Sequence, residues 1–336
     1  MSDANEFVQT PRTLSKRLWP WFLWLGVILG GFVLTVLVLN STIFSAAGFV
    51  SSYLSAVARH DVAEVLSTNG VKQSAGDRLD LLTPAALGDL SDIQLVASRD
   101  EGAGVHTVTF EYKIGGNFAR SSFLVESAGT EFGLFSAWKF AASPLATMTV
   151  TPLHDATFTV NHLTLKSKAG ADAPVPYSVI VPGLYVLSHD STYLFANRRG
   201  VEVTQPESGL DESIDIQAKP SFVDAVQQKV NSYLDQCATQ TVLFPTGCPF
   251  GQSLDNRVEG SPVWTIVDYP KVSIQPGQSS ETWIVPSTKG TAHLVATVKS
   301  LFDGSVSTFD EDVPFNLSWQ MQIEGNQVLI RFADQD

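Results

Sequence analysis

The chain has 336 residues, a hydrophobic fraction of 44% and a formal net charge of −13 at pH 7. Nucleic acids and anionic lipid surfaces need cationic partners, so this acidic balance argues against either as a ligand. The length is enough for two or three domains in addition to a membrane segment.

The first predicted element begins at Leu18 and ends at Leu39, and it is almost wholly apolar and carries no charged side chain. About 20 apolar residues that rise 1.5 Å each span the roughly 30 Å hydrocarbon core of a bilayer. A helix also satisfies its own backbone hydrogen bonds in lipid. We therefore predict one transmembrane helix over residues 19–41, with the lipid bilayer as its partner.

The residues at the start of this run predict its orientation. The candidate membrane-interface anchors are the basic Arg12, Lys16 and Arg17 and the indoles Trp19, Trp21 and Trp24. Lys and Arg concentrate on the cytoplasmic side of a membrane segment, and Trp favours the headgroup region. The pattern predicts a cytoplasmic tail over residues 1–18 and a single-pass protein of the cell membrane whose C-terminal region is extracytoplasmic.

Two further features of the apolar run leave alternatives open. Ser45, Ala46 and Ala47 offer small residues for cleavage of a signal peptide. Signal-peptide cores are about 7–15 residues long, and this run is longer, so an uncleaved anchor is the preferred interpretation. Gly26 and Gly30 form a small-residue motif that pairs membrane helices in other proteins.

A short internal repeat follows the apolar run. Residues 50–58 (VSSYLSAVA) align with residues 230–238 (VNSYLDQCA), and both lie on patterns with helical spacing. Asp61 with Glu64, and Ser221 with Asp224, have the three-residue spacing of a capping box at a helix start. We therefore predict a helix at each copy and a second short helix after Asp61.

Alternating segments that predict strands follow each helix. They cover residues 106–115, 121–126 and 132–140 after the first copy, and residues 293–301, 313–323 and 327–332 after the second. Gly325 and Asn326 are a suitable two-residue hairpin turn. A helix followed by an antiparallel meander is an α+β module, so the predicted fold class is α+β with modules over residues 44–143 and 217–336.

Residues 144–216, between the two modules, are predicted to form a small all-β domain. Strand candidates at 146–150, 156–160, 178–181 and 185–187 are broken by prolines, and helical periodicity is almost absent. Asp211, Glu212 and Asp215 are predicted to belong to a charged linker at its end.

The two cysteines, Cys237 and Cys248, both belong to the predicted outer region. An even count outside the reducing cytosol predicts one disulfide that closes a short loop. A metal site is disfavoured because two cysteines need two further ligands and no histidine is near either of them.

Catalytic chemistry is weakly supported by the sequence. The candidates for a pocket enzyme are His60, Asp61, His106, Glu111 and Tyr112. An acid–base pair needs groups within hydrogen-bond reach, whereas strand alternation places Glu111 toward solvent and Tyr112 in the core. We predict no catalytic residue, no metal site and no cofactor. The acidic residues between Asp303 and Asp312 suit Ca²⁺ as oxygen ligands, but their spacing is not that of a calcium loop, which favours a solvated hairpin.

Aromatic residues of the last module mark the candidate rim of a ligand pocket. They are Phe250, Trp264, Tyr269 and Trp283, and they lie near the loop that the predicted disulfide would close and pre-organise. Tryptophans within strands are more often part of a sheet core, which is the competing interpretation.

Several short motifs resemble a known group of proteins. Each outer module, with its V-x-S-Y-L-x-A helix and, in the first, Trp138 at the end of the sheet, is similar to the nuclear-transport-factor-2-like cone. The middle segment, with residues 159–162 (TVNH) and 181–186 (VPGLYV), resembles the small β domains of TcaA/YvbJ-like bacterial membrane-anchored envelope proteins. The resemblance implies two cone-like domains flanking a small β domain and a role in the cell envelope. It transfers no catalytic residues, and the zinc ribbon that often precedes the membrane helix in that group has no cysteines here.

Together these features favour a protein that binds or scaffolds in the bacterial cell envelope, with cell-wall or membrane proteins as partners. The first alternative is an envelope sensor, which would need a membrane partner because a tail of residues 1–18 is too short for an output domain. The second alternative is a pocket enzyme of the cone fold. The sequence leaves the ligand and the oligomeric state open.

Overall fold

The computed structural model describes residues 15–324 and 327–332, which fall into two compact units. Unit 1 comprises the chain up to Lys72, Leu90–Pro144 and Thr204–Glu207, and unit 2 comprises Gln73–Asp89, Leu145–Val203 and the chain from Ser208 onward. The predicted α+β class with one N-terminal apolar helix is confirmed. Arg12 and the turn residues Gly325 and Asn326 lie outside the described residues.

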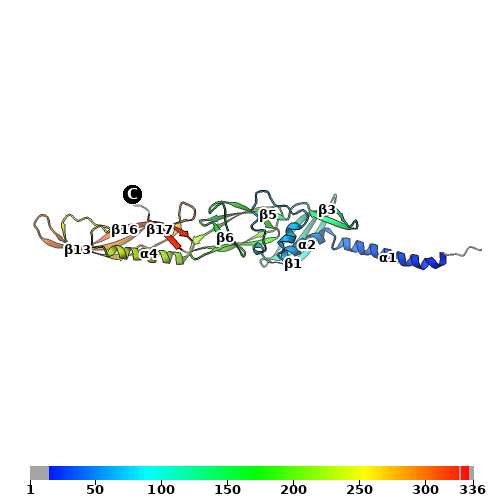
Figure 1. Ribbon diagram of the computed structural model, residues 1–336, viewed down its shortest axis with the longest axis horizontal. Helices are drawn as coiled ribbons and strands as arrows, with labels where there is room; N and C mark the ends of the chain where they lie inside the picture. The colour runs from blue at the N-terminus through cyan, green and yellow to red at the C-terminus, as the bar shows by residue number, and fades with distance from the viewer. Residues whose placement is uncertain (1–14, 325–326, 333–336) are drawn as a thin grey trace, which may run out of the picture. The chain divides into compact units, whose positions relative to one another are not determined.

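Unit 1 combines three helices with one antiparallel sheet (Figure 1). The helices are α1 (Ser15–Ser41), α2 (Ala46–Ala58) and α3 (Val62–Ser67). The strands are β1 (Leu90–Gly102), β2 (Val105–Ile114), β3 (Asn117–Glu131) and β4 (Phe135–Phe140), which pair in chain order. This is the predicted helix-then-meander arrangement.

The core of unit 1 lies between α2 and the sheet. Val50, Tyr53 and Leu54 on one face of α2 are buried, and strand β2 alternates so that Phe110 and Tyr112 are buried with them. The ring of Tyr53 lies 5.0 Å from that of Phe140 and 5.9 Å from that of Phe123. The predicted core position of Tyr112 is therefore confirmed.

The two predicted capping pairs have different outcomes. Asp61 is the N-cap of α3, and its carboxylate accepts a hydrogen bond from the Glu64 amide at 3.0 Å, as predicted. The prediction for Ser221 was wrong: α4 (Pro220–Ala238) begins after Lys219, and the Ser221 hydroxyl donates to the Thr192 carbonyl. Proline is favoured at the first helical position because its missing N–H would have no partner there. The helix therefore starts two residues earlier than a Ser221 cap would place it.

Unit 2 begins with strands that form two sheets over the segment predicted to be all β. One sheet has the order β12-β10-β9-β6-β7 and the other β11-β5-β8. A short helix, η1 (Pro84–Ala86), precedes them. The strands are β5 (Leu145–Leu153), β6 (Thr157–Val160), β7 (Leu163–Lys166), β8 (Val175–Ile180), β9 (Gly183–Asp190), β10 (Leu194–Val203), β11 (Gly209–Asp215) and β12 (Gln217–Ala218).

The predicted charged linker is part of this sheet structure. Asp211, Glu212 and Asp215 lie in β11, which pairs in parallel with β5, so the linker interpretation was wrong. Exposed and less exposed residues alternate along β11, and the side chain of Ile214 is buried. Asp211 and Asp215 occupy outward positions of this half-buried strand, whereas Glu212 shares the face of Ile214 and pairs with Arg199.

The C-terminal part of unit 2 is a second helix followed by an antiparallel meander. After α4 come β13 (Arg257–Asp268), β15 (Thr282–Lys299), β16 (Val306–Glu324) and β17 (Gln327–Phe332), paired in chain order, and β14 (Gln275–Pro276) pairs with β15. The element order thus parallels that of unit 1. The internal repeat itself remains a prediction.

One hydrophobic core runs through unit 2 from the small β segment to the C-terminal meander. The ring of Phe222 on α4 lies 5.3 Å from Tyr193 and 6.2 Å from Trp283. Residues Gln73–Asp89 belong to this unit although the sequence assigns them to the domain 44–143, because the backbone of Arg78 hydrogen-bonds β8 on both sides. The predicted boundaries otherwise stay predictions.

Candidate functional site

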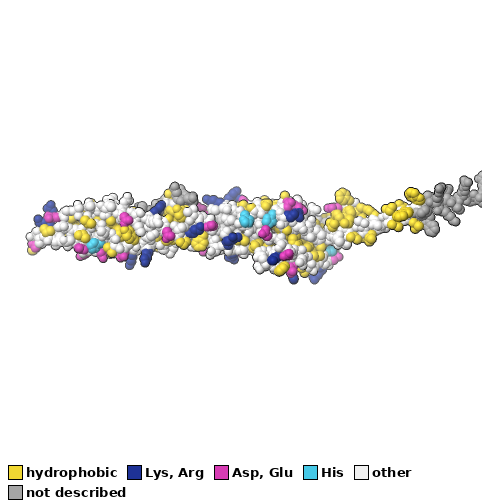
Figure 2. All heavy atoms as spheres, turned by 90° about the horizontal axis from the view of Figure 1, so that it is seen from below, with side chains coloured by type: hydrophobic (Ala, Val, Ile, Leu, Met, Phe, Trp, Pro, Cys, Tyr) yellow, Lys and Arg dark blue, Asp and Glu magenta, His cyan; other side chains and the backbone are white. Residues whose placement is uncertain are grey.

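Helix α1 is long and apolar enough to span a membrane. Its stretch from Trp21 to Ser41 has a mean hydropathy of 2.6, and its large apolar side chains are exposed (Figure 2). A helix of this length rises roughly 30 Å. Among the described residues it is the one helix with this property, and Trp21 and Trp24 are exposed near its start. The orientation predicted from Arg12, Lys16, Arg17 and Trp19 stays a prediction.

The junction after α1 is a compact, hydrogen-bonded turn. The amide of Phe44 donates to the Leu39 carbonyl at 2.9 Å, and the Ser45 hydroxyl accepts from the Gly48 amide at 3.0 Å to cap α2. A Cβ on Gly48 would come within 2.3 Å of the Ile43 carbonyl oxygen. Glycine is therefore required for this close approach of α2 to the end of α1.

The side chain of Asn40 ties this junction to the sheet of unit 1. Its Nδ2 donates to the Leu134 carbonyl at 2.9 Å, and its Oδ1 accepts from the Ser136 amide at 2.9 Å. The Trp138 indole N–H donates to the Phe44 carbonyl at 2.9 Å, and the rings of Phe44 and Phe135 stack at 4.4 Å. The end of α1, the turn and β4 thus form one bonded structure.

A groove with a volume of about 770 Å³ opens beside this junction. One wall is the outward face of α2, where Ser51, Ser55 and Arg59 follow one another at four-residue spacing and Ser52 lies beside them. Such spacing places side chains in one row on a helix. The hydroxyl of Ser55 donates to the Ser51 carbonyl at 2.8 Å and keeps its lone pairs for a ligand.

The opposite wall of the groove comes from β4, with Ser136, Ala137 and Trp138. Phe44 and Phe49 add apolar surface. The groove therefore combines hydroxyl groups with aromatic faces, which is the usual composition of a site for a small polar or amphiphilic ligand. A smaller cavity of about 220 Å³ shares Phe49 with it.

The charged groups of the groove are few. Arg59 forms an ion pair with Glu64 at 2.7 Å, and its side chain stays more than half exposed. Glu131 lines the groove from the end of β3. Because the guanidinium group is only partly neutralised by a solvent-exposed partner, it is available to a polar ligand. The row of Ser51, Ser55 and Arg59 is the sequence signal for this wall, although no site was predicted from it.

The five enzyme candidates occupy structural positions within unit 1. Asp61 caps α3, Glu111 pairs with Arg120 at 2.7 Å, and the buried Tyr112 hydroxyl lies 2.6 Å from the Ser121 hydroxyl. The His106 ring packs against Trp138 at 4.9 Å, and His60 has a positive φ of 57° at the turn before α3. These contacts bring none of the five together as an acid–base pair.

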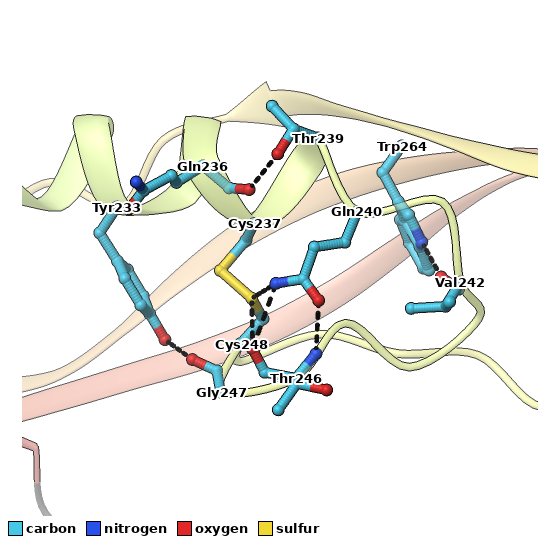
Figure 3. The surroundings of a disulfide bond; sticks show 10 residues. All are labelled: Tyr233, Gln236, Cys237, Thr239, Gln240, Val242, Thr246, Gly247, Cys248 and Trp264. Atoms are coloured by element: carbon cyan, nitrogen blue, oxygen red, sulfur yellow. Dashed lines mark hydrogen bonds between the residues drawn. A yellow bond between two sulfur atoms is a disulfide. The ribbon is translucent and has the colours of Figure 1, made fainter.

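The predicted disulfide is confirmed. Cys237 in α4 and Cys248 are bonded, with their Cα atoms 5.8 Å apart, and Gln240 holds the loop between them by accepting from the Thr246 amide at 2.8 Å (Figure 3). The Tyr233 hydroxyl donates to the Gly247 carbonyl. The Trp264 indole N–H donates to the Val242 carbonyl at 2.8 Å.

The four aromatic residues of the predicted rim contact different partners. Phe250 and Trp264 are buried and pack at 4.9 Å, whereas Trp283 is buried against Phe222. Tyr269 is exposed, and its hydroxyl donates to Asp235. Three of the four rings thus face the core, and the structure brings only Phe250 and Trp264 together. The ligand pocket proposed for this rim stays a prediction.

The acidic hairpin of unit 2 is organised around a histidine. His293 lies on β15, with Nδ1 2.8 Å from Asp312 and Nε2 3.0 Å from Asp310 on β16. The hydrogen bond to Asp312 and the charge of Asp310 raise the pKa of His293. In the turn, hydrogen bonds from Ser305 lower the pKa of Asp303 to about 2. Within the described part of the chain, no cluster of three or more His, Cys, Asp or Glu residues is arranged to hold a metal ion.

A second cavity, of about 320 Å³, lies in unit 2 beside a bulge of β10 between Ala196 and Arg199. Arg198 and Arg199 line it, and Arg199 pairs with Glu212 at 3.1 Å. Asp215 lines it too. Because carboxylates already offset the guanidinium charge here, the cavity attracts an anion less than its arginines suggest, and we assign it no ligand.

No family model, no curated protein and no solved structure matches this chain. The similarity to TcaA/YvbJ-like envelope proteins and to the cone fold therefore rests on the short motifs alone. The groove beside α1 is the larger of the two cavities described in unit 1, and its walls come from α2, the preceding turn and β4.

Proposed function

We propose that this protein is a single-pass membrane protein whose extracytoplasmic region binds or scaffolds a component of the bacterial cell envelope through the groove of unit 1. The observation that carries the proposal is that Thr42, Ile43 and Phe44, which line the groove, directly follow the helix that is apolar enough to span a membrane. A groove in this position would open at the bilayer surface. Its ligand would then be a lipid headgroup or an envelope component held at the membrane.

The finer parts of the proposal follow from the sequence. Helix α1 is inserted with the N-terminus in the cytoplasm, and both helix-plus-meander modules are cone-like domains of the nuclear-transport-factor-2 type. The disulfide supports an oxidising location for unit 2, because such bonds persist outside the cytosol. The hydroxyl-rich lining favours binding over acid–base catalysis.

Site-specific photo-crosslinking in intact cells tests the proposal. A benzophenone amino acid at Ser52, which is exposed in the groove, is compared with the same probe at Thr265, which is exposed on β13 of unit 2. We expect the probe at Ser52 to give a defined lipid or envelope-protein adduct. The probe at Thr265 should give several-fold less of that adduct. Equal, diffuse labelling from both positions would argue against a site in the groove.

The identity of the adduct separates the alternatives for function. A wall-assembly protein or a lipid would favour scaffolding or binding. A membrane kinase as the neighbour would favour a sensor that signals through its partner.

A further inference from the structure

The hairpin between β3 and β4 carries an exposed aromatic side chain, Phe132. Phe132 is 91% exposed. Its backbone is held in the left-handed region with φ of 51°, followed by Gly133 with φ of 69°. Phenylalanine adopts this conformation rarely. Exposed aromatic rings of this kind mark contact surfaces when further apolar side chains lie nearby.

The direction of β4 shows where this hairpin tip lies relative to α1. The ring of Phe135 stacks on Phe44 in the turn before α2, whereas Phe140 packs against Phe49 in the first turn of α2. Strand β4 therefore runs along α2 away from α1, and going back from Phe135 to Phe132 leads toward α1. Figure 1 shows the hairpin reaching the end of α1.

Asn40 holds the hairpin in this position. Its amide bonds the carbonyl of Leu134 and the amide of Ser136, so the tip lies two residues beyond a bonded contact with α1. Leu134 is 46% exposed and Ile43, in the turn after α1, is 65% exposed. Three apolar side chains from two segments are thus exposed around the end of the same helix.

We propose that Phe132, Leu134 and Ile43 form a second membrane contact, in which the hairpin tip enters the interfacial layer of the outer leaflet and holds unit 1 against the bilayer. The inference rests on the proposed function, because it requires α1 to span the membrane. Apolar and aromatic side chains at this level are favoured in the boundary between headgroups and acyl chains. The occupant is the bilayer because the patch continues the exposed apolar surface of α1.

Site-directed spin labelling of the full chain in phosphatidylcholine–phosphatidylglycerol vesicles tests the inference. The sequence has two cysteines and both are in the disulfide, so an introduced cysteine is labelled selectively. The test position is Phe132→Cys. The matched control is Phe118→Cys, which is 66% exposed at the other end of β3, roughly 45 Å along the strand. Val33→Cys in α1 reports on the anchor.

The measurement is the collision rate of each spin label with oxygen and with a water-soluble nickel chelate. Oxygen concentrates in lipid and the chelate in water, so their ratio should be several-fold higher at Phe132 than at Phe118. A ratio at Phe132 equal to that at Phe118, with Val33 in lipid, would overturn the inference and leave the anchor intact. Protection of the Phe132 label from both reagents would place the label against protein and would also overturn the inference. A Val33 label in water would refute the anchor and the inference together.

Discussion

The amide of Ser136 in β4 donates a hydrogen bond to the side chain of Asn40 at the end of α1, across 96 positions in the chain. The same Asn40 side chain donates to Leu134. These two bonds connect the predicted membrane helix directly to the sheet that forms one wall of the groove. The groove is therefore fixed to the helix rather than suspended from it by a flexible linker.

Replacement of Asn40 by alanine should loosen this connection. Two hydrogen bonds in a solvent-accessible position contribute about 1 kcal/mol together. We expect amide exchange at Ser136 to become several-fold faster in Asn40→Ala, with the core of unit 1 unchanged. The control is Ser41→Ala, because the Ser41 hydroxyl bonds only the Val38 carbonyl of its own helix among the described contacts. Equal exchange at Ser136 in both variants would show that the Asn40 contact does not order β4.

Removal of the disulfide should destabilise unit 2 and leave unit 1 intact. The sequence separation of 11 residues between Cys237 and Cys248 corresponds to about 2–3 kcal/mol in the chain-entropy model. Thermal unfolding of a Cys237→Ala, Cys248→Ala variant should show a lower midpoint for unit 2 only. A simultaneous loss of both transitions would contradict the division into two units.

The continuous core of unit 2 predicts that the small β segment and the C-terminal meander unfold together. Phe222→Ala removes a fully buried ring that contacts both Tyr193 and Trp283, at a cost of about 3–5 kcal/mol. Hydrogen exchange should then rise in β9 as well as in β15. The matched control is Phe244→Ala, whose ring is exposed in the same unit. Protection of β9 that survives in Phe222→Ala would mean that the two parts are independent domains.

The pH response of the acidic hairpin follows from His293. Its pKa is raised above the ordinary value of about 6.5 by Asp312 and Asp310. The stability from the charged imidazole is therefore fully present below about pH 6.5 and is lost as pH rises through the raised value. In a nuclear magnetic resonance titration, Asp312→Asn should lower the pKa of His293. Asp303→Asn should leave it unchanged, because Asp303 bonds Ser305 instead. The same His293 pKa in both variants would rule out control by Asp312.

Local patterns in the sequence predicted the elements whose signals are contained in a few residues. The alternation in β2 placed Tyr112 in the core, and the spacing of Asp61 and Glu64 placed the start of α3. Ser221 misled because Pro220 outcompetes it for the helix start. Strand β11 was missed because its evidence lies in its parallel pairing with β5, which is distant in the sequence.

The groove was beyond prediction for the same reason. Its α2 wall is visible as a row of polar residues at helical spacing, but the opposite wall comes from β4. Contacts between residues about 90 or more positions apart bring the two walls together, among them those of Asn40 and Phe44 with β4. The rim around Trp264 and Trp283 was inferred from proximity along the chain, and strand alternation turned most of its rings inward.

The most direct test of the central claim is the accessibility of the groove in intact cells. A cysteine at Ser52, in the groove, is compared with a cysteine at Asn5, in the predicted cytoplasmic tail, by labelling with a membrane-impermeant maleimide. We predict that Ser52→Cys is labelled in intact cells and Asn5→Cys only after permeabilisation, with both proteins in the membrane fraction. Labelling of Asn5→Cys alone in intact cells, or recovery of the full-length chain in the soluble fraction, would contradict a groove held at the outer surface by α1.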